Sequence, residues 1–228
     1  AGCSKVSPGC DHCYAETIQL RFKRSGPFDR SGSAVQLHPE RLDEPAHWKK
    51  PRMIFVCSMS DLFHTRVPDE FIDQVFWRMF ENPQHTFQIL TKRPNRVLRW
   101  WTTWLERDQS RPQEIGWPSH IWLGTSVESQ QFVGRINLLA RVPAPVRFVS
   151  LEPLLGPVDL MPLMTNISWV IVGGESGPRA RPMEPPWVRS IWAQCSVSHT
   201  PFFFKQWGGL RPGGPALLDG KEYHEWPR

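Results

Sequence analysis

Three of the five cysteines in this 228-residue chain, Cys3, Cys10 and Cys13, lie close together near the N-terminus. Two residues separate Cys10 from Cys13, which lets both thiolates reach one metal ion or one metal cluster. Pro8 and Gly9 bend the loop, so that Cys3 can return to the other two thiolates. The spacing therefore predicts a metal centre with three cysteine ligands.

Two kinds of metal centre fit three cysteines on one loop. A structural zinc ion is normally closed by four protein ligands, and His12 or His64 could supply the fourth. The sequence, however, contains no second pair of closely spaced ligands. A 4Fe–4S cluster held by three cysteines instead leaves one iron open to an external ligand. We favour the cluster, because zinc would need a distant fourth ligand.

The composition is typical of a soluble cytoplasmic protein. Lys and Arg number 27 against 22 Asp and Glu, a net charge of +5 that favours anionic partners without identifying one. No apolar run approaches the ~20 residues that cross a bilayer, so no membrane partner is expected. An odd number of cysteines suits metal-binding thiolates in a reducing compartment better than disulfides. We expect Cys57 and Cys195 to be core residues.

The elements that must position the cysteine loop follow from hydrophobic periodicity. Six apolar stretches rich in β-branched and aromatic residues predict strands covered on both faces. They are 53–58, 86–92, 121–127, 146–152, 167–174 and 201–206. Helical spacing of apolar residues lies between them, in 71–80, 97–105, 132–140 and 188–195. This alternation predicts an α/β fold with parallel strands, either a doubly wound sheet or a barrel.

Each predicted strand turns polar at its carboxyl end. In parallel α/β folds these ends share one face, where ligands bind. Hydroxyls, carboxylates, amides and basic groups follow the six strands: Ser58, Ser60, Asp61, Thr91, Lys92, Arg93, Ser126, Glu128, Glu152, Glu175, Ser176, Lys205 and Gln206. We therefore expect a binding site at this face of the sheet.

A second interpretation makes the chain a zinc-stabilised nucleic-acid-binding protein without catalysis. Basic residues that could contact phosphates are Lys49, Lys50, Arg52, Lys92, Arg93 and Arg96. Beside them Trp100, Trp101 and Trp104 could form a stacking surface for bases. We favour the other explanation of these tryptophans, a helix that packs its aromatic face on a sheet, because aromatic stripes more often belong to the core.

Motifs along nearly the whole chain resemble a known family. They are "GCSKVSPGCDHCYAE", "FVCSMSDLFH", "QILTKRP", "WLGTSVE", "RFVSLEPLLGP", "VIVGGESG" and "PFFFKQWGG". Together these are similar to a phage- and bacteria-associated family of radical S-adenosylmethionine (SAM)-like proteins, related to enzymes of the spore-photoproduct-lyase type. The resemblance implies a partial (β/α) barrel of TIM type over residues 1–207, a first strand before Ala1 and a loop-rich extension over 208–228. The first gap between cysteines, six residues, is longer than the three of most radical SAM enzymes.

The resemblance also assigns roles to residues. Cys3, Cys10 and Cys13 would ligate three irons of the cluster, and the open iron would take the amino and carboxylate groups of SAM. Lys92 would meet the SAM carboxylate and Ser126 would be a further contact. His12, before the last cysteine, would lie near the adenine. "SMSD", with Ser58, Ser60 and Asp61, takes the place of the motif that holds the SAM amino group in typical members.

The function that these motifs imply is a radical SAM enzyme. An external donor would supply one electron, and SAM would yield a 5'-deoxyadenosyl radical that abstracts hydrogen from a substrate. A nucleic acid is a candidate substrate. Glu152, Glu175 and Asp61 are the candidate catalytic carboxylates. The alternatives are the zinc-stabilised nucleic-acid-binding protein and an inactive radical SAM-like protein that serves a partner.

Overall fold

The computed structural model describes residues 1–21, 35–107, 116–210 and 215–227. Six parallel strands form one sheet in the order β1-β2-β3-β4-β5-β6, so every strand pairs with its neighbours in sequence. Their bounds are β1 Met53–Val56, β2 Thr86–Thr91, β3 Ile121–Ser126, β4 Arg147–Leu151, β5 Trp169–Gly173 and β6 Phe202–Gln206. The sheet curls into a half-barrel. This confirms the six predicted strands and the partial α/β barrel.

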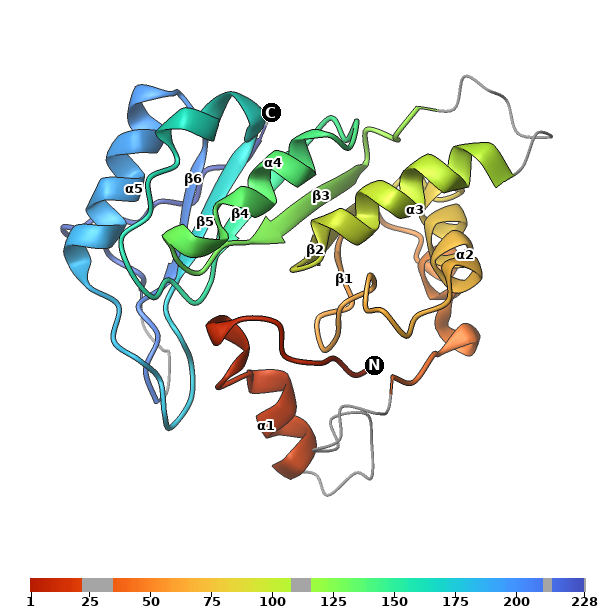
Figure 1. Ribbon diagram of the computed structural model, residues 1–228, viewed down its shortest axis with the longest axis horizontal. Coiled ribbons are helices and arrows are strands. Elements are labelled where there is room, and N and C mark those ends of the chain that lie inside the picture. Colours follow the sequence, from red (N-terminus) through yellow and green to blue (C-terminus); the bar gives the residue numbers. More distant parts are fainter. Residues whose placement is uncertain (22–34, 108–115, 211–214, 228) are drawn as a thin grey trace.

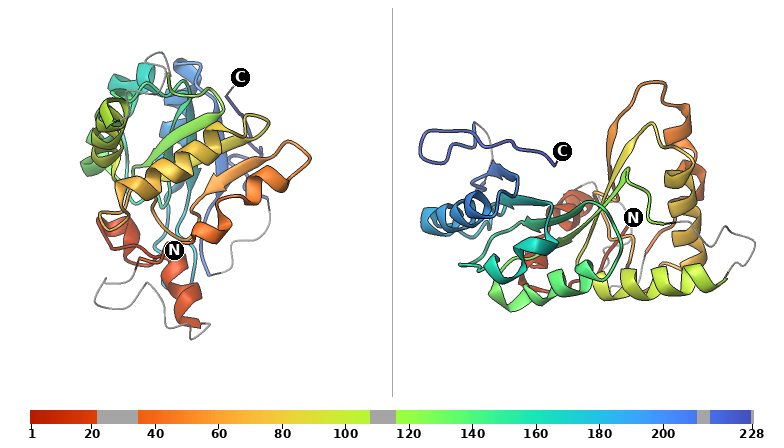
Figure 2. Two further views of the ribbon diagram at one scale, coloured as in Figure 1. Left: turned by 90° about the vertical axis from the view of Figure 1, so that its right-hand side faces the viewer. Right: turned by 90° about the horizontal axis from the view of Figure 1, so that it is seen from above.

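Helices follow the strands and cover the outer side of the curved sheet (Figures 1 and 2). Their bounds are α2 Asp69–Phe80, α3 Pro94–Arg107, α4 Gly134–Ala140 and α5 Pro185–Val197. Each lies in one of the segments with helical spacing, so these four predictions are confirmed. The helix predicted from Phe132 begins later, because residues 130–132 form the 3-10 helix η4.

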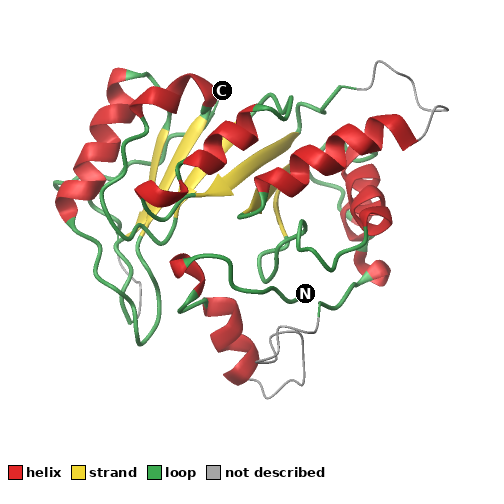
Figure 3. Ribbon diagram, in the orientation of Figure 1, coloured by secondary structure: helices red, strands yellow, loops and turns green. Residues whose placement is uncertain are grey.

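The N-terminal segment lies at the edge of the sheet where the strands end, opposite the edge where they start. It contains the 3-10 helix η1 Pro8–Cys10 and the helix α1 Tyr14–Arg21. Figure 1 shows it beneath the arrowheads of the strands, and Figure 3 shows that only loops join the strands at this edge. The cysteine loop therefore faces the carboxyl ends of the strands.

Two hydrophobic clusters hold the sheet to its helices. One joins β4, β5 and β6 to α5, and the other joins β1, β2 and β3 to α2 and α3. Trp100, Trp101 and Trp104 are all at most 5 % exposed and surround Phe76 of α2 at ring distances of 5.2–5.7 Å. The hypothesis that these tryptophans form a stacking surface for bases is therefore wrong. Their rings form the core under α3, as the favoured interpretation predicted.

Cys195 is a core residue of α5, as predicted, and it is 1 % exposed. Cys57 is different. The strand β1 ends at Val56, and Cys57 follows in a turn with φ of 61°, a left-handed conformation that few non-glycine residues adopt. Its side chain packs against the second cluster and also lines the cavity described below. The prediction that Cys57 lies within a strand is therefore wrong.

The segment after β6 returns along that strand. The backbone N–H of Phe204 donates to the carbonyl of Tyr223, and the N–H of Glu225 donates to the carbonyl of Phe202. Leu218 is 1 % exposed and belongs to the first hydrophobic cluster. Among the described helices, none is long and apolar enough to span a membrane.

Candidate functional site

A cavity of about 450 Å³ opens at the carboxyl ends of the strands. It is lined by all the residues proposed from the sequence for the cluster, for SAM or for catalysis: Cys3, Cys10, His12, Cys13, Ser58, Ser60, Asp61, Lys92, Ser126, Glu152 and Glu175. The thiols come from the N-terminal loop, and the other side chains come mainly from the ends of β1 to β5. One cavity thus joins groups that lie up to 172 positions apart in the chain.

The three thiols are presented by short local structure. The turn of η1 closes with the N–H of Cys10 on the carbonyl of Ser7 at 2.8 Å, and Sγ of Cys10 lies 3.9 Å from Oγ of the same serine. Cys13 directly precedes α1, whose first turn begins with the N–H of Thr17 donating to the Cys13 carbonyl. All three thiols are half-buried and unbridged. They are therefore accessible from the cavity.

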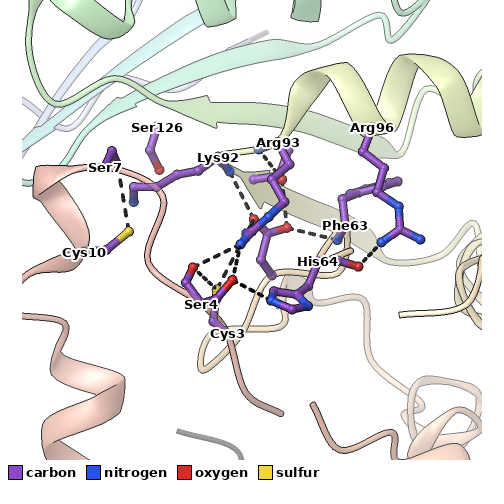
Figure 4. A network of polar contacts seen from close by, with 12 residues as sticks. Cys3, Ser4, Ser7, Cys10, Phe63, His64, Lys92, Arg93, Arg96 and Ser126 are labelled. Atoms are coloured by element: carbon purple, nitrogen blue, oxygen red, sulfur yellow. Dashed lines mark hydrogen bonds and ion pairs between the residues drawn. The ribbon is translucent and has the colours of Figure 1, made fainter. Parts of the chain in front are cut away.

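Arg93, directly after the end of β2, anchors the first part of the cysteine loop (Figure 4). Its Nη2 donates to the carbonyl and hydroxyl of Ser4 at 3.0 and 3.1 Å, and its Nη1 lies 3.7 Å from Sγ of Cys3. The side chain is 10 % exposed and pairs with Asp61 at 2.8 Å. Burial raises the pKa of the Cys3 thiol, while the guanidinium of Arg93 acts in the opposite direction.

Asp61 has a structural role in this arrangement. Its Oδ1 accepts from the N–H of Phe63 and the hydroxyl of Thr91, and its Oδ2 accepts from Arg93 and from the N–H of Lys92. Four donors therefore occupy the carboxylate, which joins the turn after β1 to the end of β2. Charge-assisted hydrogen bonds of this kind fix geometry well.

Glu175, after β5, anchors the second part of the cysteine loop through Arg181 and His12. Arg181 donates two side-chain bonds and one backbone bond to the carboxylate, and its Nη2 also donates to the carbonyl of Pro8 at 2.8 Å. Nδ1 of His12 lies 2.9 Å from Oε2 of Glu175. Burial alone would raise the pKa of Glu175, but the bonds from Arg181 and then His12 outweigh it and lower this pKa from 4.5 to about 2.

Two close backbone approaches complete the support of the loop. Gly2 bridges to Ser60 in parallel pairing. Gly9 lies over Glu128, and a Cβ at this glycine would come within 3.1 Å of its Oε1. Glu128 is fully buried and pairs with Arg135 through Oε2, while its Oε1 has no hydrogen-bond partner among the described residues. Contacts at the carboxyl ends of β1, β2, β3 and β5 thus hold the cysteine loop in place without a ligand.

Lys92 stretches from the end of β2 toward Cys10 and Ser126, as Figure 4 shows. A lysine at this place could also be a surface side chain paired with Asp61 or Glu128. In the described part of the chain, however, those carboxylates pair with Arg93 and Arg135. The ammonium group of Lys92 faces a half-buried cavity and can take an anionic ligand.

The side of the cavity away from Arg93 carries a different ion pair. Glu152, after β4, accepts from Nζ of Lys205 on β6 at 2.8 and 3.0 Å, and Lys205 is 51 % exposed. The hydroxyl of Tyr14 donates to the carbonyl of Ser58 across the entrance. Tyr14, Arg181 and the anchoring role of Arg93 were not predicted, because their partners lie far away in the sequence.

His64 is not placed to be the fourth ligand of a zinc ion. This ring is 1 % exposed, its Nδ1 accepts from the N–H of Arg66, and its Nε2 is 2.8 Å from Oγ of Ser4. Across the described ranges, no three His, Cys, Asp or Glu side chains converge closely enough for a single metal ion. A cluster does not require such convergence, since each cysteine ligates a different iron. Three thiols line the same cavity, and one of them, that of Cys3, lies beside the guanidinium of Arg93.

The basic residues proposed to contact phosphates are only in part on the surface. Arg93 and Arg96 are each 10 % exposed at the side chain and pair with Asp61 and Asp69. Arg96 also donates to the backbone carbonyls of His64 and Val67. The assignment of these two arginines to phosphates is therefore wrong, because both are used inside the fold.

Comparison with known proteins gives one match. A protein-family model matches residues 1–227 with the description "protein of unknown function (DUF5131)". No curated protein and no solved structure matches the chain. Because the match spans almost the whole chain, the protein belongs to the DUF5131 family.

Proposed function

We propose that this chain is a radical SAM enzyme in which Cys3, Cys10 and Cys13 hold a 4Fe–4S cluster and SAM binds beside it. The observation that carries the proposal is the single cavity that brings the three thiols together with polar side chains from five strand ends. Ligands of parallel α/β folds bind at that edge of the sheet. The motifs that resemble radical SAM proteins supply the same residues independently.

The loop with the three cysteines is suited to hold a cluster open on one side. Arg93 holds the loop at Ser4 and Arg181 holds it at Pro8, so the thiols would meet the cluster with little loss of conformational freedom. A reduced cluster held by Cys3, Cys10 and Cys13 would supply one-electron chemistry for the cleavage of SAM to methionine and a 5'-deoxyadenosyl radical. The electron comes from an external one-electron donor.

Lys92 and Ser126 are placed to orient SAM. A lysine ammonium in a half-buried cavity is costly to desolvate unless an anion meets it, and the SAM carboxylate is such an anion. The hydroxyls of Ser58 and Ser60 line the cavity at the place where the SAM amino group is expected. His12 is held through Nδ1 by Glu175, which leaves its ring to contact the adenine.

The three candidate carboxylates divide into two roles. Asp61 and Glu175 are occupied by arginine and backbone donors, so we assign both to positioning the loop. Glu152 has a half-exposed partner, Lys205, and can exchange it for a substrate group. We therefore assign Glu152 to the substrate side of the cavity. An open pair of opposite charges at this side suits a polar substrate.

Apolar side chains shield the interior of the cavity. Phe55, Leu90 and Pro153 line it together with Val6 and Met59. Exclusion of water and of stray hydrogen donors is what a radical intermediate requires of its surroundings. These residues need not touch the substrate to serve this purpose.

Reconstitution with iron and sulfide under anaerobic conditions tests the proposal. We expect a reduced cluster whose electron paramagnetic resonance (EPR) spectrum changes when SAM is added, and 5'-deoxyadenosine as a product after reduction. A spectrum that does not respond to SAM would contradict enzyme activity and favour the inactive partner protein. Stoichiometric zinc without iron would favour the zinc-stabilised nucleic-acid-binding protein.

A further inference from the structure

Arg93 is a charged residue whose side chain contacts the sulfur of a proposed cluster ligand. Its Nη1 lies 3.7 Å from Sγ of Cys3 and 2.8 Å from Oδ2 of Asp61, so one nitrogen is shared between a thiol and a carboxylate. Cys10 has a neutral contact, the hydroxyl of Ser7 at 3.9 Å. The three cysteines are therefore not equivalent in their electrostatic surroundings.

We propose that Arg93 and Asp61 together set the reduction potential of the cluster, Arg93 by raising it and Asp61 by lowering it. This inference rests on the proposed function, because it requires a cluster at Cys3. Reduction adds one electron from an external one-electron reductant, and no bond forms or breaks. Hydrogen bonds to ligating sulfur and nearby charges are known determinants of such potentials.

The direction of each effect follows from charge. Reduction places additional negative charge on the cluster and on its thiolates. A guanidinium N–H that points at Sγ of Cys3 stabilises this charge, whereas the carboxylate of Asp61 destabilises it. Both side chains are about nine-tenths buried, at 10 % and 8 % exposure, so water screens them weakly.

Hydrogen bonds from neighbouring residues hold Asp61 and Arg93 in place. Asp61 is held by the N–H of Phe63 and by Thr91, and Arg93 is held by Ser4 of the cysteine loop. Neither side chain can turn away without losing several hydrogen bonds. Arg93 and Asp61 are therefore positioning residues that act on the cluster through Cys3.

Two substitutions predict shifts of opposite sign. Arg93→Lys keeps a cation for Asp61 but loses the planar fork that also reaches Cys3 and Ser4. We expect its potential to fall by the equivalent of at least a tenfold change in the reduction equilibrium, about 59 mV for one electron. Asp61→Asn keeps Arg93 beside Cys3 and removes the opposing charge, so its potential should rise.

Arg147→Lys is the control. Arg147, the first residue of β4, is half-buried, and its guanidinium donates to the backbone carbonyls of Val142, Ala144 and Asn166, none of which lines the cavity. EPR-monitored potentiometric titration of the three reconstituted variants and the wild type measures the potentials. The potential of Arg147→Lys should equal that of the wild type.

Equal potentials in the wild type, Arg93→Lys and Asp61→Asn would overturn the inference and leave the proposed function intact. A fall in Asp61→Asn would also overturn it. If Arg93→Lys loses the cluster, the sign of the shift in reduction potential of Asp61→Asn decides whether the inference holds. A wild-type protein that takes up no cluster would contradict both this inference and the proposed function, so the two failures can be distinguished.

Discussion

Replacing Glu175 by Gln should destabilise the fold in a way that depends strongly on pH. The carboxylate of Glu175 receives Arg181 and His12, and these bonds, against the effect of burial, lower its pKa from 4.5 to about 2. A carboxyl group whose pKa is lower in the folded than in the unfolded state stabilises the fold above its unfolded pKa. This stabilisation is lost as the pH falls toward the folded value.

The magnitude follows from the size of the shift. Each pKa unit corresponds to 1.36 kcal/mol, so ionised Glu175 contributes up to about 3 kcal/mol to the free energy of unfolding at pH 7. At pH 3 the same relation leaves about 1 kcal/mol. We therefore expect Glu175→Gln to lose most stability at neutral pH. Its difference from the wild type in free energy of unfolding should shrink between pH 5 and pH 2.

Urea unfolding of the cluster-free protein under reducing conditions, repeated between pH 7 and pH 3, measures this difference. Glu152→Gln is the control, because the pair of Glu152 with Lys205 is half exposed and such pairs contribute about 0–1 kcal/mol. A loss in Glu175→Gln that is the same at pH 7 and pH 3 would refute the reasoning. A loss of stability no larger than that of Glu152→Gln would refute the stabilising role of the contacts that Glu175 makes with Arg181 and His12.

Three further substitutions probe the site and the sheet. Lys92→Ala should keep the cluster and weaken SAM binding at least tenfold in calorimetric titration, because it removes a charge-assisted hydrogen bond of about 1.5–3 kcal/mol; unchanged affinity would contradict the role of Lys92. Gly124→Ala places a Cβ 2.3 Å from the ring of Phe148, and overpacking of this kind costs about 1–3 kcal/mol, which a lower midpoint of thermal unfolding would show; an unchanged midpoint would mean that the ring yields freely. Gly9→Ala brings a Cβ to 3.1 Å from Oε1 of Glu128 and should reduce bound iron with the circular dichroism spectrum retained; full iron content would show that the loop adapts.

The strands and the location of the site were predictable from the sequence for physical reasons. Strands buried on both faces are almost continuously apolar, and each predicted stretch contained one strand of the sheet. For β1 the predicted cover on both faces is wrong, because Met53 and Phe55 of this edge strand are exposed. The polar residues after those strands lie at one edge because all strand pairs are parallel. That the three cysteines lie near them was implied by the resemblance to radical SAM proteins, and not by the spacing of the cysteines.

The support of the cysteine loop could not be predicted. Arg93 contacts Ser4 across 89 positions, and Arg181 contacts Pro8 across 173 positions, and such pairs leave no periodic pattern in the sequence. For the same reason Asp61 was taken for a candidate catalytic residue, although four donors occupy it. The turn at Cys57 was missed because an apolar run does not reveal the change of backbone conformation that ends a strand.

The most direct test of the central claim is the iron and acid-labile sulfide content of the protein after anaerobic reconstitution, compared among the wild type, Cys10→Ala and Cys195→Ala. Cys195 is buried in α5, outside the cavity, and is the matched control for loss of a thiol. We expect equal iron and sulfide with absorbance near about 400 nm in the wild type and in Cys195→Ala, and loss of most iron in Cys10→Ala. Equal iron in all three proteins, or zinc in place of iron in the wild type, would contradict a cluster held by the three N-terminal cysteines.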